Sequence, residues 1–439
     1  MATGTVASVA LREWETVSPD TDEKLSGLFL DDLPEVRTLA GALTAAGKLE
    51  VLELKRGLSI RARAHVGNIS LGRLSITIRP KLDAFKLLPL LRYAYRLRNF
   101  EPHGQTRYAT GLAGLQDLLL QQLAAESTEL FARGIHRHYE RRENGLTAPR
   151  GRIDFRALMR QPIPRSTLPC IHHPRTENCL LNRVLCAGLR FGVHLTDEPL
   201  LRGRLRGMAA LLEESVGPIP LNSTLLRRAA QATNRLTAAY RPALSLIEIV
   251  AHSRGITLDS NDLDLRLPGF LFDMNRFYQM LLSRFLAENL TGYKVQNEFR
   301  LADLFAYVPG YNPHSRRSPT PRPDFVILSG SRTAAVLDAK YRDLWSEELP
   351  REMLYQLTLY SMGWGGGGVA TILYPTMHRE AREARIEFRN PLAQTGKCQV
   401  VLRPVDMEVV AQLIAGDRRC QRGRIQYAQW LVFGKEGEA

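Results

Sequence analysis

The order of apolar and polar residues predicts a β-rich start to the chain. Apolar and polar residues alternate over 58–60 and 74–78, and glycines at positions 57, 67 and 72 stand beside these runs. A period of two is the pattern of half-buried strands, and glycine suits the turns between them. Residues 49–82 are therefore predicted to be mostly strand, within a β-rich N-terminal domain over residues 1–100.

The pattern becomes helical from about residue 85 to residue 240. Leucines at positions 112, 115, 119 and 123 recur every three or four residues, which places them on one face of an amphipathic helix. The segments 151–155 and 162–174 interrupt the pattern. A middle region of mainly helices and loops is thus predicted over residues 101–258, with a boundary in the Asp-rich segment 259–268.

The remaining residues, 259–439, predict a third domain. Helical patterns alternate there with short apolar runs, and a loop precedes the first of these runs: helices at 272–290 and 351–362, runs at 325–328, 334–337 and 369–374, and the loop at 312–323. Helices that alternate with short strands are typical of a mixed sheet flanked by helices. The predicted fold class is therefore α+β multidomain, with an α/β C-terminal domain built on a mixed central sheet.

Two acidic residues and a lysine stand out in this third domain. Asp324 precedes the first apolar run, and Asp338 and Lys340 follow the second. A strand through residues 336–341 aims Asp338 and Lys340 at one side, because strand side chains alternate faces. The Gly- and Ser-containing segment 329–333 predicts a hairpin turn that brings Asp324 opposite Asp338.

These residue types fit metal-assisted cleavage of a phosphodiester. Two carboxylates are hard oxygen ligands suited to Mg²⁺, which neutralises phosphate charge and polarises a P–O bond. A neighbouring lysine orients or activates the attacking water. Asp324 and Asp338 are accordingly the predicted metal ligands. The plain alternative for an isolated Asp-x-Lys is a hairpin with solvated charges.

The helix predicted over 351–362 adds two further candidates. Gln356 and Tyr360 are four residues apart, hence on one helical face. From that face they would contact the metal site or a nucleic-acid backbone. A tyrosine at helical spacing is also often a core residue, since its ring buries readily, so both interpretations of Tyr360 stay open.

Composition and charge narrow the class of protein. The 439 residues are 44% hydrophobic and 24% charged, as in soluble globular proteins. Neither a secretory signal nor a membrane span is visible, which predicts a cytoplasmic protein. The net charge is +14, of which residues 1–255 carry +12 and residues 256–439 carry +2. Such asymmetry is typical of contact with a polyanion such as DNA, and also of a basic solvated surface.

Three kinds of site are not expected from this sequence. The five cysteines are odd in number and scattered, and Cys170 and Cys179, with His172 and His173 between them, match no zinc spacing. No Gly-Lys pair is followed by Ser or Thr, as a phosphate-binding loop requires. A disulfide framework, a zinc site and nucleotide hydrolysis by this chain are therefore not predicted.

Taken together, the motifs resemble a known family. Pro323-Asp324, Asp338-Ala339-Lys340, Gln356 and Tyr360 look like the PD-(D/E)xK nuclease superfamily, in its branch with a Gln-x-x-x-Tyr helix. Four earlier segments, in order, resemble the McrC family: Arg79-Pro80-Lys81-Leu82, Gly151-Arg152-Ile153-Asp154-Phe155, Glu177-Asn178-Cys179-Leu180-Leu181-Asn182-Arg183 and Asp273-Met274-Asn275. The resemblance spans roughly residues 50 to 435.

Resemblance to McrC implies the endonuclease subunit of a type IV restriction system, used in phage defence. It implies cleavage of double-stranded DNA with Mg²⁺, beside a McrB-like AAA+ GTPase hexameric ring that uses GTP and typically reads modified cytosine. The N-terminal domain is the expected docking part, and GTPase stimulation is expected. By resemblance, Asp324 and Asp338 bind the metal, Lys340 is the catalytic lysine, and Gln356 and Tyr360 support the site.

One position departs from the superfamily pattern, in which the helix before the hairpin often offers a glutamate. Arg276 and Gln279 stand there instead, and Glu288 lies farther along. Two alternative functions remain: a RecB/Cas4-like repair nuclease that acts at DNA ends, and a non-catalytic adaptor that only activates the ring. In the adaptor, Asp338 and Lys340 form a structural ion pair, worth about 0–1 kcal/mol on a surface.

Overall fold

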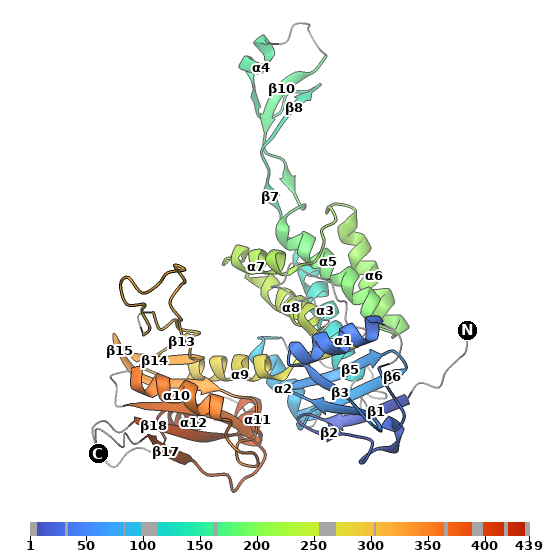
Figure 1. Cartoon of the computed structure of the whole chain (residues 1–439). Helices are drawn as coiled ribbons and strands as arrows, with labels where there is room; N and C mark the ends of the chain where they lie inside the picture. Colours follow the sequence, from blue (N-terminus) through green and yellow to red (C-terminus); the bar gives the residue numbers. More distant parts are fainter. Residues whose placement is uncertain are drawn as a thin grey trace. The chain divides into compact units, whose positions relative to one another are not determined.

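The chain forms two compact units in the computed structural model (Figure 1). Met1–Val66, Ser70–Leu97 and Asp273–Ala439 make the first unit, and Gly67–Ile69 with Arg98–Phe272 make the second. The structure describes residues 7–30, 34–82, 84–97, 113–160, 166–253, 269–302, 304–363, 368–388, 398–416 and 420–434. The expected boundary at 259–268 and Leu112 lie outside these residues.

Two small sheets contain the N-terminal strands, which confirms the strands predicted over 49–82. One sheet has the order β2-β4-β3, and the other has the order β1-β6-β5-β12, in which β1 runs parallel to β6. The strands are β1 (Ala7–Arg12), β2 (Thr16–Val17), β3 (Leu49–Leu54), β4 (Gly57–Ala62), β5 (His65–Leu71), β6 (Leu74–Arg79) and β12 (Gly269–Asp273); the helices are η1 (Glu23–Leu25), α1 (Pro34–Ala45) and α2 (Ala84–Ala94).

A six-stranded mixed sheet forms the C-terminal part of the first unit, as the sequence predicted. Its order is β13-β14-β15-β16-β18-β17, in which β15, β16 and β18 run parallel and the other neighbours pair antiparallel. The strands are β13 (Lys294–Asn297), β14 (Phe325–Ser329), β15 (Arg332–Ala339), β16 (Val369–Thr376), β17 (Ala384–Phe388) and β18 (Cys398–Asp406); the helices are α9 (Met274–Asn289), α10 (Arg351–Gly363), α11 (Met407–Ala415) and α12 (Gln421–Phe433).

Helices pack on this sheet and bury the end of β15. The α10 side chains Leu357 and Tyr360 join one hydrophobic cluster with Ile372 of the sheet. Arg403 of β18 donates from Nη1 to the Leu431 carbonyl of α12, at 2.9 Å, and both α9 and α12 contact β15. Side chains at the carboxyl end of β15 are therefore shielded from water, which sets the environment of the candidate site.

The hairpin that joins β14 to β15 is tighter than predicted. Ser329 pairs with Arg332, so the turn consists of Gly330 and Ser331 rather than the whole segment 329–333. Gly330 has a φ of 62°, a left-handed conformation that glycine adopts without steric cost. The two-residue turn and a one-residue shift in the pairing between Ile327 and Leu328 together set the register of the two strands, and hence the position of each acid along them.

The start of α9 also differs from the prediction. The helix predicted over 272–290 begins at Met274, because Phe272 and Asp273 end strand β12. The Asp273 carboxylate accepts hydrogen bonds from two N–H groups of the first helical turn, including that of Asn275 at 2.9 Å. Asp273 is thus the N-cap of α9.

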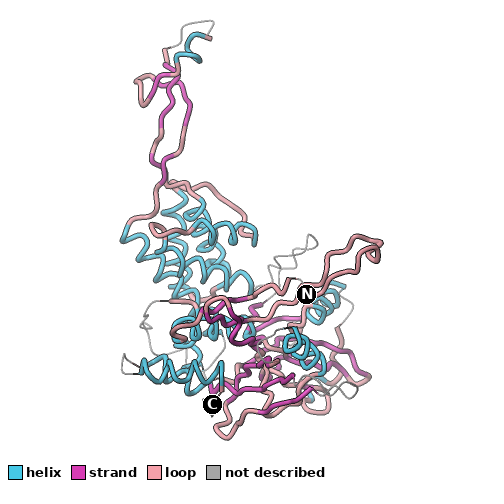
Figure 2. Tube along the Cα trace, turned by 90° about the vertical axis from the view of Figure 1, so that its left-hand side faces the viewer, coloured by secondary structure: helices cyan, strands magenta, loops and turns pink. Residues whose placement is uncertain are grey.

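The second unit is a bundle of helices that carries a long arm of strands (Figure 2). The helices confirm the helical pattern, and the arm adds strands that the prediction of mainly helices and loops did not include. The strands of the arm were missed because they are mostly polar, without a clear alternation: β8 is exposed at four of its five positions. The helices are α3 (Ala113–Arg133), α5 (Leu180–Leu195), α6 (Pro199–Glu213), α7 (Ser223–Ala232), η2 (Ala238–Tyr240) and α8 (Arg241–Ser253); the arm contains β7 (His138–Tyr139), β8 (Arg142–Leu146), β9 (Arg152–Ile153), α4 (Phe155–Met159), β10 (Leu168–His172) and β11 (Arg175–Thr176).

A buried carboxyl of the N-terminal part lies beside the residue that follows Lys340. Tyr341 is 5% exposed and interacts with Glu13, which is 2% exposed. Burial raises the pKa of Glu13 to about 7, against the opposing effects of the neighbouring Tyr341 and the Lys81 charge. The Glu13 carboxyl is therefore a protonatable group in the core of the first unit.

Candidate functional site

Asp338 and Lys340 form a buried ion pair at the end of β15. Asp338 lies inside β15 and is 1% exposed, and Lys340 is the first residue after the end of that strand. Lys340 Nζ lies 2.7 Å from Asp338 Oδ2. The two side chains thus lie on the same side, as the period of two predicted.

Asp324 joins this pair from the neighbouring strand of the hairpin. It comes directly before β14, and Phe325 pairs with Leu337, so Asp324 lies beside the Asp338 end of β15. Asp324 Oδ2 accepts a hydrogen bond from the Ala339 N–H at 2.7 Å, and Asp324 Oδ1 accepts one from Gln279 Nε2 at 2.8 Å. The structure therefore brings together the three residues that the sequence placed at the centre of the site.

Burial dominates the protonation chemistry of the two acids. It raises the pKa of Asp324 to about 7, the charge of Asp338 adds to this rise, and the Ala339 N–H and Lys340 oppose it. Burial also raises the pKa of Asp338, although the charge of Lys340 opposes that shift. For Lys340, burial alone would lower the pKa, but the charges of Asp338 and Asp324 outweigh it and raise the pKa. Lys340 therefore stays a cation.

Gln356 and Tyr360 lie on one face of α10, as predicted. Gln356 Nε2 donates to the Tyr360 hydroxyl at 2.7 Å. The Tyr360 ring is 2% exposed and belongs to the hydrophobic cluster under α10, while its hydroxyl feels the charges of Asp338 and Lys340. Tyr360 is therefore a core residue whose hydroxyl lies within electrostatic reach of the site, and its contact with a metal or a nucleic acid stays a prediction.

Gln279 reaches the site from the helix before the hairpin. It lies on α9 and fixes Asp324 through its side-chain amide, at 2.8 Å. The sequence marked this helix but gave no sign that the amide would contact Asp324. The signal that could have found the contact is the N-cap Asp273, which sets where α9 begins and hence the face on which Gln279 lies.

Glu298 is an acid near the site that the sequence did not indicate. It follows β13 and is exposed, its backbone N–H donates to the Asp324 carbonyl at 3.0 Å, and its charge raises the pKa of Asp324. Its φ of 46° is left-handed, which is uncommon for a residue other than glycine. Only the pairing of β13 with β14 places it here, and that pairing follows no short-range sequence pattern.

The donor atoms fit one hard divalent cation held by two protein ligands. Asp338 is buried, and its Oδ2 accepts no hydrogen bond of normal geometry besides the ionic contact with Lys340. Each carboxylate oxygen of Asp324 keeps a lone pair beyond the one hydrogen bond it accepts. Within the described ranges, no group of three or more His, Cys, Asp or Glu side chains is arranged for a metal ion. Two carboxylates suffice for Mg²⁺, which usually keeps several waters.

These features define the class: an α+β protein whose mixed sheet presents a carboxylate–carboxylate–lysine site at the end of one strand. The chain belongs to the family described as McrBC 5-methylcytosine restriction system component, whose model matches residues 60–375. The resemblance stated from the motifs is thereby confirmed, and the protein is a component of a McrBC restriction system.

A solved structure shows the same fold. The refined half-complex from a tetradecameric assembly of Thermococcus gammatolerans McrB AAA+ hexamers with bound McrC contains a similar chain, with a TM-score of 0.58 and 21% identity over 95% of this chain and 98% of that chain. A chain of the cryo-EM structure of the Thermococcus gammatolerans McrBC complex has a TM-score of 0.46 and 20% identity. The match covers 65% of this chain and 89% of that chain. No curated protein matches the chain. Among the described residues, no helix has both the length and the apolar character to cross a bilayer.

Proposed function

We propose that this chain is the Mg²⁺-dependent endonuclease subunit of its McrBC system and cuts double-stranded DNA. The observation that carries the proposal is the buried Asp338–Lys340 pair, with Lys340 Nζ 2.7 Å from Asp338 Oδ2 and Asp324 beside it. Two acids and a lysine at one point are the groups that phosphodiester hydrolysis needs. Family membership supports a role in restriction.

The residues of the site have separate tasks in this proposal. Asp324 and Asp338 would hold Mg²⁺, which when bound supplies charge neutralisation at the scissile phosphate. Lys340, kept charged by Asp338, donates hydrogen bonds to the attacking water and to the phosphate oxygen. Gln279 and the Ala339 N–H fix the orientation of the Asp324 carboxylate. Gln356 positions the Tyr360 hydroxyl next to these charges.

The proposed partner is a McrB-like AAA+ ring that hydrolyses GTP. The similar solved chain is McrC bound to McrB AAA+ hexamers, which supports such a partner for this chain. The two N-terminal sheets are the proposed docking part, and docking is proposed to stimulate the GTPase. The pair acts in the cytoplasm, where its double-stranded DNA substrate lies.

Cleavage and GTPase assays on the same complexes test this function. The purified chain with its ring partner, GTP and Mg²⁺ should cut susceptible DNA, whereas Asp338→Asn and Lys340→Ala should each abolish cutting and leave GTPase stimulation intact. Lys294→Ala is the matched control, because Lys294 is an exposed lysine on β13 of the same sheet. Persistent cutting by both site variants would refute the site.

A non-catalytic adaptor is the second candidate, since Asp338 already has an internal cation partner. Calorimetric titration with Mg²⁺ separates the two functions: heat of binding that Asp338→Asn removes supports the nuclease, and no binding supports the adaptor. A covalently closed DNA circle tests the remaining alternative. A repair nuclease that acts at DNA ends leaves the circle intact, whereas the proposed endonuclease opens it.

A further inference from the structure

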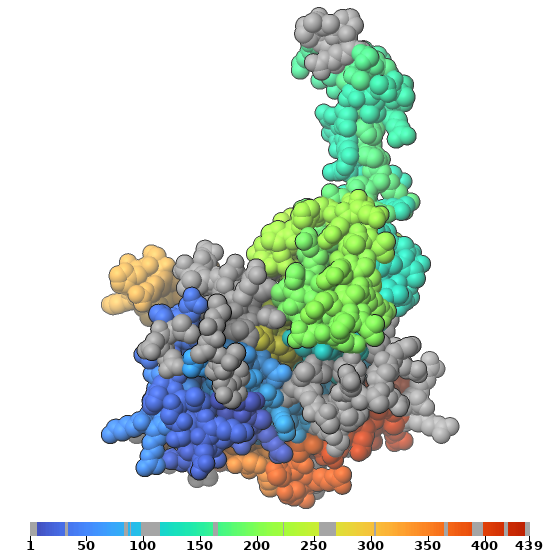
Figure 3. Space-filling view, turned by 90° about the vertical axis from the view of Figure 1, so that its right-hand side faces the viewer, coloured from blue at the N-terminus to red at the C-terminus, as the bar shows by residue number. Residues whose placement is uncertain are grey.

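A long loop between β13 and β14 closes directly onto the candidate site. It spans residues 299–323 and ends one residue before Asp324. Its base is a continuation of the strand ladder: Glu298 N–H donates to the Asp324 carbonyl at 3.0 Å, and Leu301 N–H donates to the Pro321 carbonyl at 2.9 Å. In the space-filling view the loop stands out from the surface (light orange, Figure 3). The loop is therefore fixed at one end and projects at the other.

Apolar side chains hold the first residues of the loop in the domain core. Leu301 is 7% exposed and belongs to the cluster under α10, and Phe299 and Leu304 pack against that cluster. Leu304 lies against Gly363 at the end of α10, where a Cβ would meet its side chain at 2.5 Å. The base of the loop is thus part of the folded core, and only the segment beyond Leu304 is free to make contacts.

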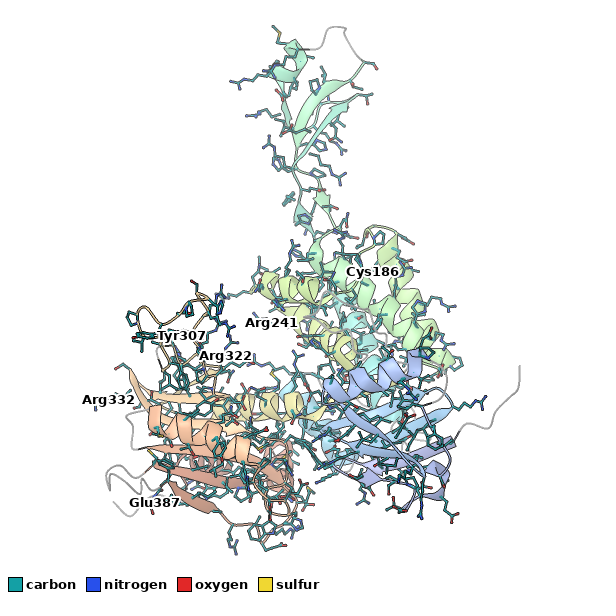
Figure 4. The ribbon with its side chains drawn as sticks, in the orientation of Figure 1. Cys186, Arg241, Tyr307, Arg322, Arg332 and Glu387 are labelled. Carbon is teal, nitrogen blue, oxygen red and sulfur yellow. The ribbon has the colours of Figure 1, made fainter. Side chains whose placement is uncertain are left out.

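The projecting segment is basic and aromatic. Tyr307 is 41% exposed and Tyr311 is 78% exposed. Arg316, Arg317 and Arg322 are exposed as well, and among the described residues no carboxylate pairs with any of the three. Figure 4 shows Tyr307 and Arg322 in this loop. Over 299–323 the sequence has four arginines and a single acid, so the segment has a charge of +3.

Local hydrogen bonds and prolines restrict the conformation of the segment. Asn312 accepts a hydrogen bond from the Arg316 N–H at 2.9 Å and donates one to the Arg316 carbonyl at 2.8 Å. Five of the residues over 299–323 are prolines, which restrict the backbone. Preorganisation of this kind lowers the entropic cost of binding. An exposed aromatic pair in an ordered, basic loop is poorly explained as a solvated connector.

We propose that residues 305–323 are a DNA-gripping loop that holds the duplex next to the site. Arg316, Arg317 and Arg322 contact backbone phosphates, because guanidinium groups pair well with phosphate oxygens. Tyr307 and Tyr311 lie against the sugars or in the groove. The position of Arg322, two residues before Asp324, brings the gripped phosphates close to the one that is cut. This inference rests on the proposed nuclease function and names the part of the chain that contacts its DNA.

Anisotropy of a labelled DNA duplex measures the grip without cleavage, with the full chain in Ca²⁺ in place of Mg²⁺. The triple variant Arg316→Ala, Arg317→Ala and Arg322→Ala should weaken binding at least about tenfold near 0.1 M salt, and should make the salt dependence of log Kd shallower by about 3. The double variant Tyr307→Ala and Tyr311→Ala should weaken binding at least about fivefold with the salt dependence unchanged. Arg332→Ala is the matched control, since Arg332 is exposed at the opposite end of the hairpin (Figure 4).

The outcomes separate this inference from the proposed function. Wild-type affinity in both loop variants, or no DNA binding by the wild-type chain, overturns the gripping loop. Loss of ring binding together with unchanged DNA binding also overturns it and makes the loop a protein contact. If DNA binding falls as expected but the wild-type complex never cuts DNA, the loop stands and the nuclease proposal fails. Unchanged melting of every variant excludes unfolding as the cause.

Discussion

The end of β15 and the loop beside it place their charges in opposite ways. Asp338 is 1% exposed and is paired with Lys340 at 2.7 Å, whereas Arg322, two residues before Asp324, is exposed. A buried charge is tolerated only with a partner, so the structure fixes the geometry of the site strongly. An exposed arginine keeps its water and is ready for an incoming phosphate. The groups proposed to perform the chemistry are thus buried and paired, whereas the groups proposed to bind DNA are exposed.

The largest effect is expected from Lys340→Met, which breaks the buried pair. Asp338 then loses its cation in a buried place, so the free energy of unfolding should fall by about 3 kcal/mol and DNA cutting at least about a hundredfold. Urea unfolding and cleavage assays measure the two. The double variant Asp338→Asn with Lys340→Met should recover most of the stability and none of the cutting. A single variant as stable as wild type would show that the pair is solvated.

A pH effect of similar size is expected from Glu13, a buried acid outside the site. Its pKa of about 7 in the folded chain lies above the ordinary value of 4.5, so the carboxyl loses its proton at a lower pH in the unfolded chain than in the folded one. The contribution of this group to stability should therefore be largest below pH 4.5 and fall between about 4.5 and 7, by on the order of 3 kcal/mol. Comparing unfolding of wild type and Glu13→Gln across this range checks it: the difference between them should vary with pH, and a constant difference contradicts the prediction.

A smaller effect is expected from Gln279, which holds Asp324 by one hydrogen bond. Gln279→Leu should lower the rate of cutting roughly tenfold and the stability by about 1 kcal/mol, because Asp324 Oδ1 loses its donor. Gln279→Glu adds a carboxylate at the same place and should lower the Mg²⁺ concentration needed for half-maximal cutting. A Mg²⁺ dependence identical in all three proteins would mean that Gln279 is only a packing residue.

The smallest effect on stability is expected from the exposed side of the comparison. Arg322→Ala should change the free energy of unfolding by less than about 0.5 kcal/mol, since the side chain is exposed and pairs with no carboxylate of the described residues. Thermal and urea unfolding measure this. A destabilisation of several times that size would mean that the Arg322 side chain contributes to the folded core. Arg322 would then not differ from Lys340 in its role in stability.

The contrast between buried and exposed groups also explains which features the sequence could predict. Alternation along a strand is a short-range rule, so the common side of Asp338 and Lys340 was predictable from the spacing alone. The hairpin and α10 followed from apolar runs of normal length. These features depend on burial, and burial leaves a periodic pattern in the sequence.

Features that depend on pairing between distant segments were not predictable. Glu298 reaches Asp324 only because β13 pairs with β14 across the long loop. The apolar Phe272 is compatible with the start of a helix and with a strand. It lies in a strand because β12 pairs within a sheet. The polar strands of the arm leave no apolar alternation to read.

Lys340 also makes the folding of the proposed nuclease independent of metal binding. Asp338 has a cation at 2.7 Å before any metal arrives, so the folding of this corner does not wait for a divalent ion. Small zinc domains behave differently, because they fold only once their metal binds. In the proposed nuclease, the chain therefore folds without its metal, and chelation of Mg²⁺ should abolish cutting without unfolding the protein. The supply of Mg²⁺ then decides when the proposed nuclease is active, and not whether the protein stays folded.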